Sequence, residues 1–163
     1  MHFGSPVTRR DTLPSLDHAL LWTMRAWVLG LCRKQDMAER IHHVFHSLGA
    51  PEGGPQLDRF MRALSHGARR SLEVHCVCNP QVSDDELSLL AVFQLQQAER
   101  HEEAFETLCG LTAEHAAIAG CDSANRIAIA LAECGQRLRA PLPLGGPASW
   151  HCTIVDPGLH QLH

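Results

Sequence analysis

Apolar residues recur at three- and four-residue steps along most of this chain, and that spacing marks one face of an α-helix. The first apolar stripe starts after Ser15 or Asp17, either of which suits a helix N-terminus, and continues as an inward face to Leu31. Polar residues interrupt the stripe before it resumes over residues 37–48, so the pattern predicts two helices or one bent helix. The proline- and glycine-rich residues 50–55 predict a linker.

Ser83 and Glu86 mark the clearest helix start in the sequence, because the pair has the spacing of a capping box. The helix that begins there should pair with a second helix in a hairpin over residues 84–111. This hairpin is predicted to form the centre of the core and to bury Leu90 and Leu95. The other predicted helices cover residues 56–65, 112–120 and 124–138.

The hairpin carries Leu90, Gln94 and Ala98, followed by the sequence Glu102-Glu103-Ala104-Phe105. In this spacing it resembles a single tetratricopeptide-type helical hairpin. No second copy occurs at an offset of about 34 residues, whereas a stable array needs roughly three repeats or more. The resemblance therefore implies two antiparallel helices and says nothing about a ligand.

Residues 71–78 differ from the rest of the chain because Leu72, Val74, Cys76 and Cys78 alternate with other residues. A period of two predicts a short extended segment. The predicted fold is therefore all-α, a compact bundle of about five to six helices with a central helical hairpin and this one extended segment. The predicted parts are an N-terminal arm (residues 1–14), a helical domain (residues 15–140) and an irregular C-terminal tail (residues 141–163).

Composition and charge exclude several classes of function. The chain has 163 residues, 45% of them hydrophobic and 20% charged, as expected for one globular domain. A formal net charge of −4 and the lack of a long basic run argue against nucleic acid as a partner. The sequence also has no tyrosine, no phosphate-binding loop and no dinucleotide fingerprint. No active site can be assembled from its motifs, so we do not expect an enzyme.

Seven cysteines at irregular spacing predict a reducing compartment, the cytoplasm, rather than a disulfide framework. The apolar residues 19–31 follow Arg9 and Arg10 and could be mistaken for an export signal. Asp17 and Arg25 interrupt this region, however, and no cleavage site follows it. We therefore expect a buried amphipathic helix and no contact with a membrane.

His75, Cys76 and Cys78 are the sharpest candidates for chemistry. Two thiolates at positions i and i+2 of an extended segment point to one face and can share a soft metal ion, for which zinc is the usual choice. A disulfide between such close neighbours would be strained. The alternative is that both cysteines pack in the core beside Leu72 and Val74. On a strand His75 points to the opposite face, so it is poorly placed to act as a base for either thiol.

His42 and His46 lie one helical turn apart, and this spacing suits a two-ligand metal platform. Apolar neighbours define the buried stripe of the same helix. The two histidines flank that stripe, so a solvated role is the alternative.

The expected function is that of a small helical binding or regulatory module, which acts through protein–protein contacts and self-associates. No cofactor is required for such a role. The alternative is a metal-binding or metal-sensing protein that uses Cys76 and Cys78. A helix–turn–helix regulator is a third class, which the net charge disfavours.

Overall fold

The order of elements follows the predicted helical pattern closely. The computed structural model describes residues 7–140; 67% of these residues are helical, and none of them lies in a β-strand. The chain forms a short 3₁₀ helix (Arg10–Thr12) and then α1 (Ser15–Arg33), α2 (Ala38–Ser47), α3 (Gly53–Gly67), α4 (Asp84–Gln97), α5 (His101–Cys109) and α6 (Glu114–Glu133). The prediction of an all-α fold is confirmed.

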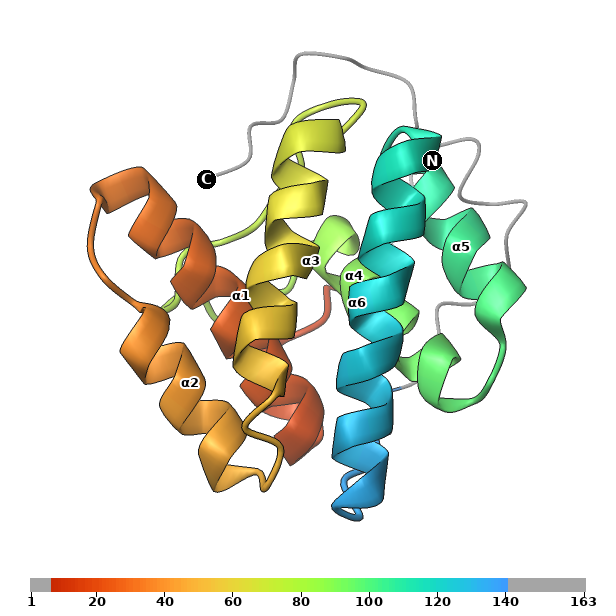
Figure 1. Cartoon of the computed structure of the whole chain (residues 1–163). Helices are drawn as coiled ribbons and strands as arrows, with labels where there is room; N and C mark the ends of the chain where they lie inside the picture. The colour runs from red at the N-terminus through yellow and green to blue at the C-terminus, as the bar shows by residue number, and fades with distance from the viewer. Residues whose placement is uncertain (1–6, 141–163) are drawn as a thin grey trace.

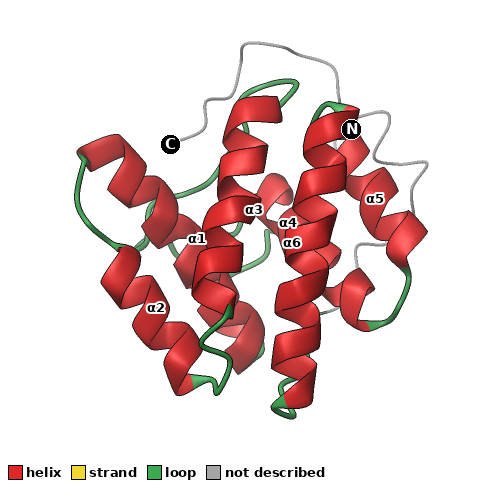
Figure 2. Ribbon diagram, in the orientation of Figure 1, coloured by secondary structure: helices red, strands yellow, loops and turns green. Residues whose placement is uncertain are grey.

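Helices α3 and α6 lie side by side and run in opposite directions, and they make the most extensive contact between any two helices of the described chain (Figure 1). Helix α4 passes behind them and contacts α6, α5 and α1. Helices α1 and α2 cover one side of this centre and α5 covers the other. Figure 2 shows that only loops connect the helices.

The core is centred on α4, which is buried on nearly all sides. Its Phe93 ring packs against Phe60 of α3 with ring centroids 4.8 Å apart. Leu90 and Leu95 are both buried, as predicted. A helix belongs in a protein interior when its side chains are apolar, or form buried ion pairs, on all of its faces. Helix α4 is such a helix.

The predicted helix boundaries differ from the observed ones at α3 and at α6. Residues 50–55 are not simply a linker, because α3 already begins at Gly53 and Pro55 lies in its first turn. Proline is tolerated there because the first amides of a helix have no partner within the helix. The two helices predicted for residues 112–120 and 124–138 are one continuous helix, α6.

Residues 71–78, the predicted extended segment, form no β-strand. The first six of these residues lie in no regular element, and the last two form a turn. Leu72 and Val74 are buried, as the alternation suggests, but Cys76 and Cys78 are exposed. The proposal that both cysteines pack in the core is therefore wrong.

Buried carboxylates fix chain segments outside the helices to the helical core. Glu86 forms a fully buried ion pair with Arg25 of α1, with Nε and Oε2 2.7 Å apart. Asp85 accepts two hydrogen bonds from the Arg70 guanidinium, each 2.8 Å long. Asp17 accepts the backbone amides that end the described chain, from Arg139 at 3.0 Å and from the next residue at 3.1 Å. These contacts join residues far apart in sequence.

In the described part of the predicted arm, residues 8–10 lie antiparallel to residues 80–82. Residues 141–163, the predicted tail, lie outside the described residues. Among the helices from residue 7 to residue 140, none has both the length and the apolar character that a membrane crossing requires.

Candidate functional site

A groove of about 660 Å³ lies between α1, α2 and α3. Helices α2 and α3 meet where Gly53 packs against Phe45, and they diverge away from that contact (Figure 1). The α3 wall of the groove includes Gly54, Asp58 and Arg62 at four-residue steps and continues to His66. Twelve residues of helix span about 18 Å, so the groove is long rather than compact.

The floor of the groove is apolar. Trp27 of α1, Met37 of the α1–α2 connection and Ile41 of α2 all contribute to it. Leu31 also lines the groove and is 54% exposed, although its place in the apolar stripe predicts an inward side chain. The groove therefore leaves part of the α1 apolar stripe open to solvent.

One hydrogen-bonded chain ties α1 to α3 at the groove. The Trp27 indole N–H donates to Asp58 Oδ1 at 2.9 Å, and Arg62 Nε donates to Asp58 Oδ2 at 2.8 Å. Burial raises the pKa of the Asp58 carboxyl, but these two donors outweigh it and lower that pKa overall. The carboxylate thus stays ionised and holds Trp27 in the floor of the groove.

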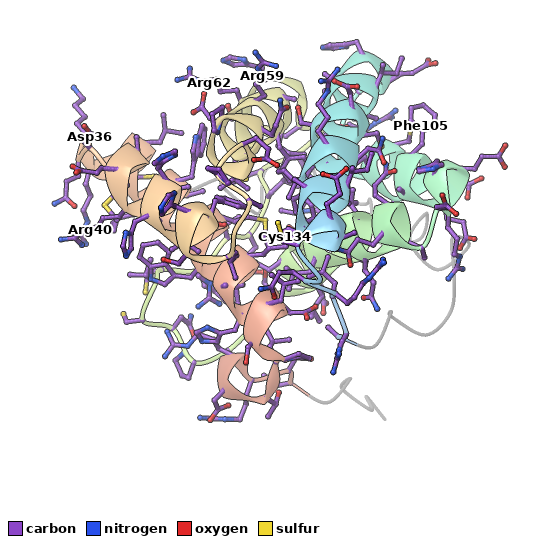
Figure 3. All side chains as sticks on the ribbon, turned by 60° about the horizontal axis from the view of Figure 1, so that its bottom comes forward. Asp36, Arg40, Arg59, Arg62, Phe105 and Cys134 are labelled. Atoms are coloured by element: carbon purple, nitrogen blue, oxygen red, sulfur yellow. The ribbon has the colours of Figure 1, made fainter. Side chains whose placement is uncertain are left out.

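Carboxylates outnumber guanidinium groups around the groove. Among residues 7–140, Asp36, Glu39 and Asp58 line it together with one arginine, Arg62, and two histidines, His42 and His66. Figure 3 shows Asp36 beside α2 and Arg62 on α3, on the two sides of the groove. Because Arg62 is already paired with Asp58, and Asp36 and Glu39 form no ion pair within residues 7–140, these two carboxylates favour a ligand with positive charge at its edge.

A pair of exposed thiols forms a second site, away from the groove. Cys76 and Cys78 have their Sγ atoms 3.3 Å apart. They come together because the chain turns here, with the Asn79 amide donating to the Cys76 carbonyl at 3.0 Å. The turn brings the two sulfur atoms together, as the sequence predicts, although these residues do not form a strand.

Arginine side chains hold this turn in place. Arg10 Nη1 donates to the Val77 carbonyl at 2.5 Å. Arg25 Nη1 donates to the Asn79 carbonyl at 2.8 Å, and its Nη2 donates to the Gln81 carbonyl at 2.6 Å. Because Arg25 is also paired with Glu86, the exposed turn is fixed to the buried interior.

The surroundings of Cys76 favour its thiolate. A hydrogen bond with the Cys78 thiol is the largest influence, and the backbone amide of Cys78 adds a second bond that lowers the Cys76 pKa. Burial acts weakly in the opposite direction, and the amide of Asn79 and the charge of Arg25 lower the pKa further.

The histidines predicted as metal ligands do not join the two thiols. His75 faces Glu73 instead, with Nδ1 3.9 Å from Oε1. His42 and His46 are exposed, with ring centroids 6.4 Å apart. Within residues 7–140, no three histidine, cysteine or acidic side chains are placed to hold one metal ion. A four-ligand zinc site is not assembled there, and Cys152 lies outside the described residues.

Sequence reasoning missed the groove entirely. A signal for it was present near the end of α1. Val28 is the last residue of this helix that is buried in the core, and Leu31 continues the apolar stripe beyond it. Comparisons of the chain with protein-family models, with curated proteins and with solved structures gave no match. The chemistry of the two sites therefore carries the functional argument alone.

Proposed function

We propose that this protein is a binding module that receives an apolar helical segment of another protein in the groove between α1, α2 and α3. The observation that carries the proposal is an open, apolar groove that follows α3 for about 18 Å. A helix laid in a groove is a recurring mode of peptide recognition, and it buries an apolar face of about this length.

The shape and charge of the groove define the ligand. A groove this long accommodates about three turns of helix, whereas a compact metabolite would leave much of its apolar floor in water. Asp36 and Glu39 favour lysine or arginine at the edge of the apolar face. The ligand is thus a basic, amphipathic helix.

A synthetic peptide tests this proposal directly. A fluorescent peptide of about 14 residues, with leucines on one face and lysines beside them, should bind saturably to the full chain. Leu31→Glu places a charge in the apolar groove and should weaken binding by roughly tenfold or more. A peptide with glutamates in place of the lysines should bind more weakly, because it faces Asp36 and Glu39.

The matched control is Ile118→Glu on α6. Ile118 is also an exposed apolar residue, at 58%, but it does not line the groove. This variant should bind the peptide as the wild type does. Equal loss in both variants, or no saturable binding to the wild type, would contradict the proposal. If Leu31→Glu instead turns a dimer into a monomer during gel filtration, the ligand of the groove is a second copy of this chain.

A metal-binding role for Cys76 and Cys78 is the second candidate function, and the 3.3 Å separation of their sulfurs favours it. Two thiolates can chelate one soft ion, with the remaining positions filled from outside the described residues. Elemental analysis of untagged protein purified without chelator tests this candidate. Metal retained in the Cys76→Ser/Cys78→Ser double variant would exclude these ligands.

A further inference from the structure

We propose that Cys76 and Cys78 form a redox-active dithiol that exchanges with small-molecule disulfides of the glutathione class. This inference is independent of the groove and of any bound metal. It rests on the position of the two thiols, which are exposed and 3.3 Å apart on a turn held by Arg10 and Arg25.

The surrounding structure keeps the thiols together and accessible. Backbone carbonyls of the turn accept hydrogen bonds from both arginines, so the turn does not depend on the cysteine side chains for its shape. The sulfurs would have to approach from 3.3 Å to about 2.05 Å to form a bond, which is a movement that side-chain rotation can supply. Cys121, by contrast, is mostly covered, and burial raises its pKa to about 11.

The reaction has two steps. The Cys76 thiolate attacks one sulfur of the small-molecule disulfide, which forms a mixed disulfide and releases one thiolate. Cys78 then loses its proton to solvent and attacks Cys76 Sγ, which closes the Cys76–Cys78 bond and releases the second thiolate. The protein loses two electrons and two protons, and the small molecule leaves as two thiols.

The ring closed by this bond contains only one intervening residue, Val77. Such a short ring is strained, and strained, exposed disulfides are easily reduced again. The strain that argues against a permanent disulfide at this position is therefore compatible with a disulfide that forms and breaks reversibly.

Trypsin provides a clean test, because cleavage after Arg70 and Arg100 releases a peptide whose only cysteines are Cys76 and Cys78. Chelator-treated, reduced full-length protein is equilibrated with mixtures of reduced and oxidised glutathione, quenched with acid, alkylated and digested. The peptide should become resistant to alkylation and lighter by two hydrogen atoms. At a constant concentration of reduced glutathione, a roughly eighty-fold increase in oxidised glutathione should carry it from about one tenth to nine tenths oxidised.

Single variants separate the two steps. Cys78→Ser should accumulate a glutathione adduct on Cys76, because the resolving thiol is gone. Cys32→Ser removes an exposed thiol elsewhere and should leave the oxidation of the peptide unchanged. The proposal is overturned if the wild-type peptide keeps both free thiols while Cys32 is glutathionylated. It is also overturned if Cys76 and Cys78 each carry glutathione and no ring forms.

Discussion

The guanidinium of Arg25 uses all three of its nitrogens inside the protein. Nε and Nη2 bind Glu86, and Nη1 and Nη2 bind carbonyls of the turn that carries the thiols. Glu86 also accepts the backbone amides of Ser83 and His75. One buried pair thus joins α1, α4 and the connection between α3 and α4.

Removing the charge of Glu86 should therefore be costly. We expect Glu86→Gln to lower the free energy of unfolding by about 3–5 kcal/mol, because it leaves Arg25 buried without a counter-charge. Asp122→Asn breaks an exposed pair with Arg126 and should change the free energy of unfolding by less than about 1 kcal/mol. Urea unfolding of both variants measures the difference, and equal midpoints would disprove the role of the buried pair.

The cysteines should react in an order that follows their surroundings. At pH 8, iodoacetamide should modify Cys76 first and Cys121 last, since the thiolate is the reactive form. With a pKa of about 11, only about one Cys121 thiol in a thousand is ionised at that pH, and raising the pH toward 11 should speed its reaction. Burial also raises the pKa of Cys109. Mass spectrometry of timed samples checks the order, and early modification of Cys121 would contradict it.

At the scale of the elements, two neighbouring glycines begin α3 but meet different surroundings. A Cβ on Gly53 would lie 2.3 Å from Cδ1 of the buried Phe45 ring, whereas a Cβ on Gly54 would come no closer than 3.4 Å to His42. Gly53→Ala should destabilise the protein by about 1–3 kcal/mol through overpacking. Gly54→Ala gains helix propensity and should be neutral or slightly stabilising. Thermal unfolding compares the two, and equal midpoints would refute the close packing of α2 on α3.

The start of α4 was predictable, but the start of α3 was not, for a physical reason. Ser83 and Glu86 satisfy the first amides of α4 from within the same turn, so the signal is local. At α3, Gly53 is needed because Phe45 approaches the backbone there, and a contact between two helices leaves no local pattern. The same composition that usually marks a linker therefore begins a helix here.

Stability against local unfolding should differ from helix to helix. Helix α2 contributes only Ile41 and Phe45 to the core, while most residues of α4 are buried. We expect the amides of α2 to exchange with deuterium well before those of α4, because few buried contacts oppose local opening. Mass spectrometry of exchanged peptides tests this, and equal protection would contradict it. Since α2 forms a wall of the groove, its opening would widen the site.

The fold class and the burial of Leu90 and Leu95 followed from the periodicity of the apolar residues. The groove and the Arg25–Glu86 pair did not, because each depends on how separate helices meet in three dimensions. The proximity of Cys76 and Cys78 followed from their spacing, while their exposure depended on a turn that arginines from elsewhere in the chain hold in place.

The hydrogen bonds from residues 139 and 140 to Asp17 have a consequence for the order of events during translation. Helix α1 leaves the ribosome more than a hundred residues before the backbone amides that satisfy its buried carboxylate. Until those amides are available, we expect Asp17 to keep water as its partner. Completion of the native state is thereby delayed until the nascent chain has delivered both ends of the helical bundle.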